Sequence, residues 1–434
     1  LAAIVVAETH PADARAATAV SAGQEHSCAI RNDGQIVCWG RGGSGRLGYG
    51  NTQNVGDDES PGSVGPVNLG PGRTARAIAA GALHTCAILD SGQVKCWGRG
   101  DDGQLGSGSR ANVGDDELPS SVGVVDLGPG RTATAIAAGD RHTCVILDTG
   151  QVECWGRGQF GRLGYGNTKS VGDDETPASV GPVDLGPGHT ARAITAGWAH
   201  TCVILDNGLV RCWGSGGAWL GNGTERNVGD NETPGTIPPV SLGRGRVARA
   251  ISTGYSHTCA VLDNRRVRCW GENSYDGNLG LGKRYEYKTV GDNEVPTAVP
   301  PVDLGAGRRA SAIAVGGITS IGGPPGGPHT CAILTGGQVR CWGDAYQGQL
   351  GYGNTHPIGD DETPGSAGPV RLGRARRATA IAAAGARTCA LLDSGAVRCW
   401  GQNTFGQLGI GNTRNIGNDE TPASVKPINL GEPK

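Results

Sequence analysis

Residues 84–98 read HTCAILDSGQVKCWG, and six other stretches of the chain follow the same plan. Each stretch holds two cysteines ten residues apart, and Trp-Gly follows the second cysteine. Successive first cysteines are separated by 58, 58, 58, 57, 72 and 58 residues. A unit that recurs at a nearly fixed period indicates a repeat architecture, in which neighbouring units stack to bury a shared core. The pairs are Cys28 with Cys38, Cys86 with Cys96, Cys144 with Cys154, Cys202 with Cys212, Cys259 with Cys269, Cys331 with Cys341, and Cys389 with Cys399.

The second unit predicts four short strands, because four apolar runs are separated by turn signals and show no helical period. These strands are expected at 76–80, 84–89, 93–97 and 122–127. Four strands in each of seven units predict an all-β fold, a seven-bladed β-propeller of four-stranded antiparallel blades over residues 16–434. Near 317–328 the sixth unit carries an insertion of about fourteen residues, which accounts for its longer step.

The turn between the second and third strands predicts a disulfide. Asp90-Ser91-Gly92 suits a three-residue hairpin, which places Cys86 opposite Cys96 on one side of the sheet. Directly opposed residues lie close enough for a disulfide bond. One cross-strand disulfide is therefore expected in each blade, and each is worth roughly 2–3 kcal/mol.

Composition limits the function. The formal net charge of −2 gives no electrostatic case for binding nucleic acid or an anionic membrane. No apolar run is long enough to span a membrane. Regularly paired cysteines are typical of an oxidising compartment, so we expect a secreted or cell-surface protein.

The first fifteen residues are expected to form an extended segment with one surplus β-strand, since LAAIVVA at 1–7 is rich in β-formers. Alternatively, this stretch is the tail of a signal peptide, or it replaces the fourth strand of the last blade and frees residues 426–430. An unpaired strand centred on Ile4, Val5 and Val6 could add to the sheet edge of another copy. Repeated head-to-tail contacts of this kind produce open filaments.

The signature GALHTCAILDSGQVKCWG at 81–98, followed by GQLG at 103–106, resembles the repeat of the regulator of chromosome condensation family. The resemblance covers residues 16–431 in seven copies and implies a seven-bladed propeller. Family members include a nuclear exchange factor with a basic tail, which this sequence lacks, and a secreted inhibitor of β-lactamase that acts by binding alone. Photoreceptors of the family cluster tryptophans at Gly-Trp-x-His-Thr, where only Trp198 matches. The paired cysteines look more like an exported bacterial branch.

Two recurring polar features have both structural and functional interpretations. The histidine of the His-Thr-Cys motif recurs in six units, is replaced by Arg387 in the seventh, and is expected to make a structural hydrogen bond. Acidic triplets could supply hard oxygen ligands for Ca²⁺, but three adjacent residues offer fewer ligands than Ca²⁺ takes, and ordinary turn chemistry before proline also explains them. The candidate calcium ligands are Asp57, Asp58, Glu59, Asp115, Asp116, Glu117, Asp173, Asp174 and Glu175. No other metal or cofactor is expected.

Departures from the repeat mark a candidate binding patch on blades 4 to 6. The fifth unit carries KRYEYK at 283–288 in place of a polar loop, and the insertion of the sixth unit is expected beside it. Exposed aromatic and arginine side chains often form the centre of protein interfaces, although loop drift is the alternative. The candidate partner-binding residues are Trp198, Trp219, Tyr255, Arg284, Tyr285 and Tyr287.

No nucleophile or acid–base set departs from the repeat pattern, so enzyme activity is not expected. The sequence predicts an exported protein-interaction propeller, either a self-assembling extracellular or cell-surface structural protein or a binder of another protein. Glycan binding by exposed aromatic residues is a further alternative.

Overall fold

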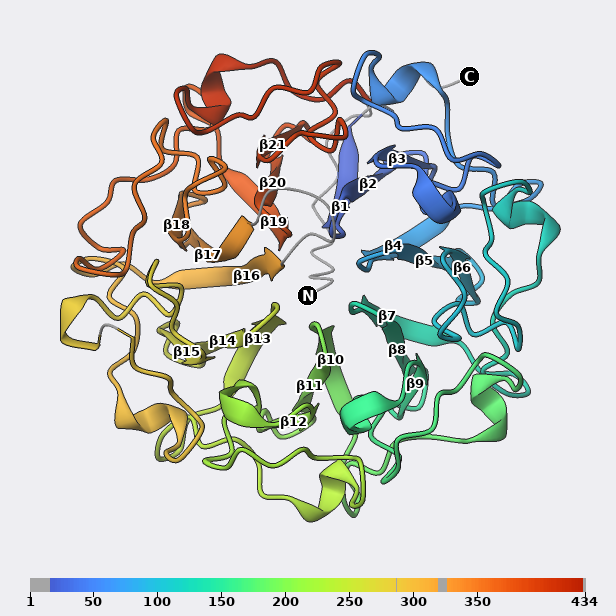
Figure 1. The fold of residues 1–434 in the computed structure, drawn as a ribbon, viewed down its shortest axis with the longest axis horizontal. Helices are drawn as coiled ribbons and strands as arrows, with labels where there is room; N and C mark the ends of the chain where they lie inside the picture. The colour runs from blue at the N-terminus through green and yellow to red at the C-terminus, as the bar shows by residue number, and fades with distance from the viewer. Residues whose placement is uncertain (1–15, 286, 319–325, 432–434) are drawn as a thin grey trace.

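The computed structural model describes residues 16–285, 287–318 and 326–431. They form seven antiparallel sheets arranged in a ring about a central axis (Figure 1). Each sheet, or blade, has three strands, and the first strand of each blade lies nearest the axis. The predicted seven-bladed propeller is confirmed. No helix in the described part of the chain is long and apolar enough to cross a membrane.

The strands follow one another in blade order. The first strands are β1 (Ala17–Ala22), β4 (Ala75–Ala80), β7 (Ala133–Ala138), β10 (Ala191–Ala196), β13 (Ala248–Thr253), β16 (Ala310–Ile318) and β19 (Ala378–Ala384). The second strands are β2 (His26–Arg31), β5 (His84–Leu89), β8 (His142–Leu147), β11 (His200–Leu205), β14 (His257–Leu262), β17 (Gly326–Leu334) and β20 (Arg387–Leu392). The third strands are β3 (Ile36–Gly40), β6 (Val94–Gly98), β9 (Val152–Gly156), β12 (Val210–Gly214), β15 (Val267–Gly271), β18 (Val339–Gly343) and β21 (Val397–Gly401).

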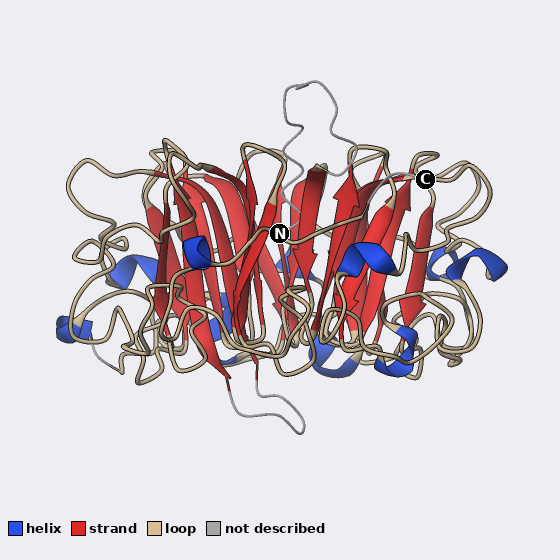
Figure 2. Cartoon of the chain, turned by 90° about the horizontal axis from the view of Figure 1, so that it is seen from above, coloured by secondary structure: helices blue, strands red, loops and turns tan. Residues whose placement is uncertain are grey.

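Helical structure in the described residues is limited to short 3-10 turns between the strands (Figure 2). One group follows third strands: η1 (Gly43–Gly45), η4 (Gln159–Gly161), η6 (Gly217–Leu220) and η8 (Lys283–Tyr285). A second group begins with proline, whose fixed φ favours the first helical position. It comprises η2 (Pro61–Ser63), η3 (Pro119–Ser121), η5 (Pro177–Ser179), η7 (Pro234–Thr236), η9 (Pro296–Ala298) and η10 (Pro422–Ser424).

The hairpin between β5 and β6 has the predicted register. Leu89 N donates to Gln93 O over 2.8 Å, and Gly92 closes the turn with a φ of +84°. Because hydrogen-bonded and non-hydrogen-bonded pairs alternate, Cys86 and Cys96 fall at a non-hydrogen-bonded pair, where opposed strands approach most closely. Their Cα atoms are 4.1 Å apart.

All seven predicted disulfides are present, one between the second and third strands of each blade. The Cα atoms of each bonded pair lie 4.0–4.1 Å apart, so the hairpin geometry is the same around the ring. The predicted pairing is therefore confirmed in every blade. The bonds join Cys28 with Cys38, Cys86 with Cys96, Cys144 with Cys154, Cys202 with Cys212, Cys259 with Cys269, Cys331 with Cys341, and Cys389 with Cys399.

The prediction of a fourth regular strand in each blade is wrong. In blade 2 the 122–127 segment makes a single bridge to β6, through Val125 N and Val94 O at 2.8 Å. In the other six blades a proline directly precedes the residue that makes the matching bond. Proline lacks the N–H that a longer ladder needs, so the edge of the blade is a loop with one contact.

The tryptophan that follows the second cysteine packs between blades. All seven of these side chains are fully buried. Trp155 Nε1 donates to Gln104 O of the preceding blade over 3.0 Å, and Thr143 Oγ1 donates to the same carbonyl over 3.0 Å. The carbonyl belongs to the Gly-Gln-Leu-Gly loop, so each loop anchors the blade that follows it.

The ring closes without the first fifteen residues, which lie outside the described part of the chain together with the candidate exchange residues Ile4, Val5 and Val6. Ile428 N donates to Val397 O over 2.9 Å, and Gly62 N donates to Asn429 O over 3.0 Å. The 426–430 segment therefore occupies the outer edge of the last blade. The alternative in which the N-terminal stretch replaces it is wrong, because that edge is already filled.

The insertion of the sixth unit lengthens a hairpin. Strands β16 and β17 have nine residues each, against six in β4 and β5, and residues 319–325 lie outside the described residues. The expected contact between this insertion and the 283–288 loop therefore stays a prediction. Figure 1 shows β16 close to the central axis, whereas the 3-10 turn beside the grey residue 286 lies at the outer edge of the ring.

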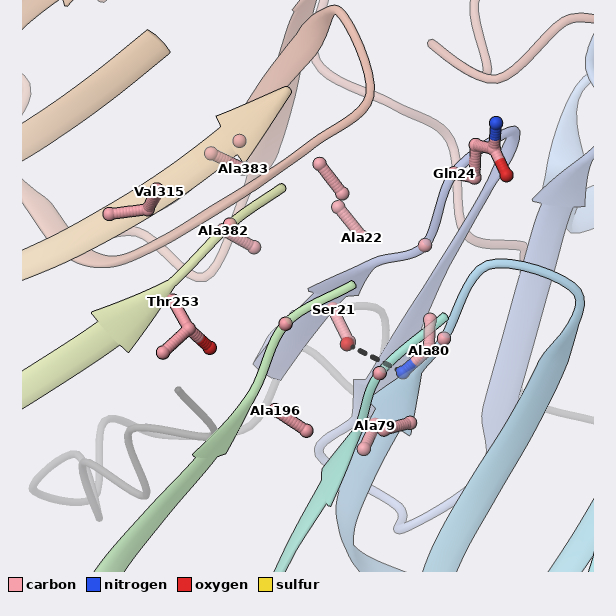
Figure 3. Close-up of a pocket in the computed structure, with 18 of the residues that line it drawn as sticks. Ser21, Ala22, Gln24, Ala79, Ala80, Ala196, Thr253, Val315, Ala382 and Ala383 are labelled. Carbon is pink, nitrogen blue, oxygen red and sulfur yellow. Dashed lines mark hydrogen bonds between the residues drawn. The ribbon is translucent and has the colours of Figure 1, made fainter. Parts of the chain in front are cut away.

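The central axis is a narrow channel of about 120 Å³. Figure 3 shows small side chains from the first strands along its wall, among them Ala79, Ala196 and Ala382. Hydroxyl groups link neighbouring first strands, as where Ser21 Oγ accepts a hydrogen bond from Ala80 N over 2.9 Å. Small side chains let seven strands converge, and they leave little chemistry in the channel.

Candidate interaction face

One face of the ring consists of the turns between first and second strands and the loops that follow third strands. We call it the turn face. In blade 2, Arg99 N donates to Leu83 O over 3.0 Å, and Ala82 N donates to Gly139 O of the next blade over 3.1 Å. Equivalent contacts recur around the ring, so the turn face has a nearly constant backbone framework. Differences between blades lie in the side chains that this framework presents.

The side chain at the second residue of the Gly-x-Leu-Gly loop differs from blade to blade. Its backbone carbonyl anchors the next blade, which leaves the side chain free to differ. In blade 2 the side chain of Gln104 closes its own loop by accepting from Asp102 N over 2.9 Å. Blades 1 and 3 have arginine at this position and blade 4 has tryptophan. The residues in order are Arg46, Gln104, Arg162, Trp219, Asn278, Gln349 and Gln407.

Four aromatic side chains from blades 3, 4 and 5 meet on the turn face, and we call them the aromatic corner: Phe160, Trp198, Trp219 and Tyr255. The ring centroid of Trp198 lies 5.1 Å from Tyr255, 5.6 Å from Trp219 and 6.4 Å from Phe160. All four rings are half-buried. The structure thus brings together three of the six predicted partner-binding residues.

Arginine side chains continue the aromatic corner toward blade 1. Arg162 Nη1 donates to Trp198 O over 3.2 Å, and its guanidinium carbon lies 5.7 Å from the Phe160 ring. Burial lowers the pKa of Arg162 to about 10, and it lowers the pKa of Arg46 to about 10 against the opposing effect of Glu25. Both arginines remain charged at neutral pH.

The other three predicted residues form a separate tyrosine group. Tyr287 packs against Tyr275 with ring centroids 4.8 Å apart, and the Arg284 guanidinium carbon lies 5.5 Å from the Tyr285 ring. No ring contact joins this group to the aromatic corner within the described residues. Tyr275, at 78% exposed, and Tyr346, at 69%, are exposed aromatic residues that the sequence analysis did not select.

The acidic triplets form compact loops. In the triplets at 57–59, 115–117, 173–175 and 360–362, carboxylate oxygens lie within 4.8 Å of one another. Some of these oxygens already serve the turn. Glu59 Oε1 accepts from Gly56 N over 3.0 Å, and Asp57 Oδ2 accepts from Asn54 Nδ2 over 3.2 Å. Calcium binding therefore stays a prediction, beside the structural interpretation.

The recurring histidines join neighbouring blades. His84 Nε2 lies 2.8 Å from Thr143 Oγ1, whose single proton goes to Gln104 O. Nε2 must therefore carry the ring proton, and it donates to the threonine. Burial lowers the pKa of His84 to about 3, so the ring stays neutral. This geometry supports the expected structural role of the histidines. Because the rings stay neutral, they are unsuited to acid–base chemistry near neutral pH.

Comparison with known proteins places the whole ring in one family. The sequence profile of the RCC1-like domain matches residues 3–322, and that of the regulator of chromosome condensation (RCC1) repeat matches 326–349 and 378–407. The chain belongs to the RCC1-like domain family. The ultraviolet-B receptor UVR8 of Arabidopsis thaliana is 31% identical to this RCC1-like chain over 397 residues, which cover 90% of the chain and 78% of the receptor.

Other relatives share the domain but differ in length. The human E3 ubiquitin-protein ligase HERC2 is 28% identical over 344 residues, which cover 77% of this RCC1-like chain and only 6% of the ligase. Human WBSCR16 has a similar structure, with a TM-score of 0.65 and 18% identity over 88% of this chain and 92% of that one. Yeast RCC1 (Prp20), solved bound to Kap60, has a TM-score of 0.60 and 20% identity over 85% and 78%. These solved structures support the fold of the RCC1-like ring.

Two features of this RCC1-like domain were missed by the sequence analysis. Phe160 has a φ of +65°, which is unusual for a residue other than glycine, and Ser44 has a φ of +59° at the same point of blade 1. The arginines of blades 1 to 3 were also missed. Three of them directly follow the Trp-Gly of their blades, and aligning the repeats at that dipeptide would have revealed Arg41, Arg99 and Arg157.

Proposed function

We propose that this chain is an exported, non-enzymatic propeller that binds other proteins through its turn face. The main support for this proposal is the aromatic corner, where four rings from three blades meet on an otherwise repetitive framework. Half-buried aromatic residues with neighbouring arginines are typical of interface centres. Prp20 is described as binding Gsp1p and histones, which is a precedent for protein binding by a propeller of this fold.

Seven disulfides in the blades support export, because such bonds persist in oxidising compartments. We place the protein outside the cell or on its surface. The proposal that it lacks enzyme activity is supported by the neutral, interblade role of the histidines.

Affinity capture from the protein's own extracellular fraction, quantified by mass spectrometry, tests this function. Trp219→Ala and Tyr255→Ala are expected to abolish capture of a partner that the wild-type protein retains. Tyr346→Ala, an exposed aromatic residue outside both the corner and the tyrosine group, is the matched control and should retain the partner. Equal capture by all variants, with unchanged melting, would remove the aromatic corner from the proposal.

A second candidate function is glycan binding by the tyrosine group. It is favoured by the exposure of Tyr275 and Tyr287, at 78% and 54%, and by their edge-to-face contact. Aromatic rings with free faces can stack against sugar rings. A glycan array probed with wild-type protein and with Tyr287→Ala tests this candidate: no binding by the wild type, or equal binding by both, would reject it.

We also propose that the chain assembles with copies of itself. This proposal is supported by the β-rich composition of residues 1–7 and by the described residues, which supply three strands for each of the seven blades. We propose that this stretch pairs with another copy. Negative-stain electron microscopy of the unreduced full chain should show filaments or arrays, whereas single discs would reject assembly.

A further inference from the structure

The turn face is hollowed across blades 1 to 5 into a cleft of about 480 Å³. Phe160, Trp198 and Tyr255 of the aromatic corner form one end of it. The rest of the lining is dominated by guanidinium groups, and we call it the arginine cleft. Its arginines are Arg41, Arg46, Arg99, Arg141, Arg157 and Arg162.

Acidic side chains hold several of these arginines in place. Glu25 pairs with both Arg41 and Arg46, at 3.0 and 3.2 Å. Arg141 pairs with Asp102 at 2.8 Å and with Asp140 at 3.4 Å. Asp101 pairs with Arg99. Six guanidinium groups thus meet four carboxylates, and the cleft carries two positive charges in excess.

The excess charge lies next to the aromatic corner. Arg157 forms no ion pair within the described residues, and its side chain is half-buried. Arg162 donates to the carbonyl oxygens of Gln159 and Trp198, and no carboxylate of the described residues pairs with it directly. Two guanidinium groups of blade 3 therefore line the same cleft as three aromatic rings and form no ion pair within the described part of the chain.

We propose that the arginine cleft binds an acidic segment of a partner polypeptide, with an apolar side chain of the same segment against the aromatic corner. The inference rests on the proposed protein-binding function and adds the chemistry of the partner. Guanidinium groups bind carboxylates through paired, charge-assisted hydrogen bonds. An apolar anchor next to such pairs would exclude water from them and strengthen the contact.

A short acidic peptide fits this charge better than a nucleic acid does. An excess of two charges would neutralise about two phosphates, and so few phosphate contacts give a nucleic acid little affinity. The whole chain has a formal net charge of −2, so the positive potential is local. It suits two or three carboxylates of a single extended segment.

Selection from a random peptide phage library, using the unreduced full chain as bait, tests the inference. Selected peptides should be enriched in Asp and Glu together with an aromatic residue. The most enriched peptide, labelled with fluorescein, is then titrated by fluorescence anisotropy. The test variant is Arg99→Gln with Arg157→Gln, because neither side chain anchors a neighbouring blade.

The control variant is Arg131→Gln with Arg246→Gln. It removes the same charge from two arginines that are more exposed, which pair with Asp148 and Asp263 in turns preceding β7 and β13 on the opposite face. We expect the test variant to bind the peptide at least about tenfold more weakly and the control variant to bind like wild type. Replacing the peptide's carboxylates by amides should produce the same loss.

Other outcomes overturn the inference. Neutral or basic selected peptides, equal binding by the test variant, or equal affinity for single-stranded DNA would each reject an acidic partner. Self-association of the wild-type chain that the test variant loses would assign the cleft to a second copy instead. If capture of a natural partner depends on Trp219 but not on Arg99 and Arg157, the proposed function stands and this inference fails.

Discussion

Arg387 Nε donates a hydrogen bond to Ser27 Oγ over 3.0 Å and so joins the last blade to the first. At the other six junctions a histidine Nε2 lies 2.8–3.0 Å from a threonine Oγ1. Serine lacks the threonine methyl group, which leaves room for the larger arginine. Arg387 Nη1 and Nη2 also donate to Gln24 O and Gly23 O, over 2.8 and 2.7 Å. One buried guanidinium therefore links the last blade to the first through several hydrogen bonds.

Removing this contact should weaken ring closure. We expect Arg387→Ala to lower the free energy of unfolding by about 2–4 kcal/mol, because it leaves several buried carbonyl oxygens without a donor. Arg387→His combined with Ser27→Thr restores the pair found at the other junctions and should recover most of the loss. Thermal unfolding of the unreduced proteins measures both effects, and hydrogen exchange should localise the loss to β1 and β19. Wild-type melting of Arg387→Ala would contradict this account.

Blade 3 carries a buried acid where its neighbour carries a base. In blade 2, Lys95 Nζ donates to Pro119 O over 2.7 Å and to Val122 O over 2.6 Å. Glu153 occupies the same place in blade 3. Its buried Oε2 has no hydrogen-bond partner among the described residues. We expect Glu153→Lys to raise the free energy of unfolding by about 1–3 kcal/mol, because lysine can donate to the loop. Urea denaturation near neutral pH measures it, and Lys95→Glu in blade 2 should have the opposite effect.

Glu153 also predicts a pH dependence. Burial, and then the nearby Asp126, raise the pKa of Glu153 to about 7 in the folded protein, while Arg131 opposes them. The folded state therefore binds its proton more tightly than the unfolded state, whose glutamate titrates near its ordinary value of 4.5. Stability should fall as the pH rises from about 4.5 through about 7. Melting temperatures of wild type and Glu153→Gln across this range test it, since the glutamine variant should lose this step.

The disulfides should be complete and individually significant. We expect no free thiol in the unreduced protein by a thiol-reagent assay under denaturing conditions. Replacing Cys86 and Cys96 together by alanine should cost roughly 2–3 kcal/mol of unfolding free energy, because it frees a short loop in the unfolded chain. Under a strong reductant the double variant and wild type should melt alike. A wild-type melting temperature that does not respond to reductant would contradict the role of these bonds.

The acidic loops should hold their shape without calcium. Glu59 Oε1 accepts from Gly56 N, and an amide oxygen can accept the same bond. We therefore expect Glu59→Gln to melt like wild type and isothermal titration of the apo protein with Ca²⁺ to give no heat. A calcium-dependent rise in melting temperature that Asp57→Asn with Asp58→Asn removes would establish the calcium site instead.

Deleting residues 1–15 should separate folding from assembly. The described residues supply three strands for each of the seven blades, so the shortened chain should melt like the full chain. Any filaments formed by the full chain should disappear, because their connecting strand has been removed. Electron microscopy at matched concentration provides the readout, and persistent filaments would show that another surface joins the copies.

Within one blade, the sequence was sufficient to predict the structure where contacts are local. The register that pairs Cys86 with Cys96 follows from one short hairpin whose turn residues can be read directly. The fourth strand was predicted from its apolar pattern, but the pattern did not reveal that the segment makes only one bond to its neighbour. A proline before the bonding residue in six blades was the available signal.

The amino-acid sequence by itself determined the repeat, the number of blades and the position of each disulfide, because period and hairpin register depend on residues close together in the chain. The tertiary structure alone decided which departures from the repeat meet. Arg387 reaches Ser27 across 360 positions, and Trp198 meets Trp219 and Phe160 from neighbouring blades. These contacts arise from ring closure and the angle between adjacent blades, and no local pattern encodes that geometry.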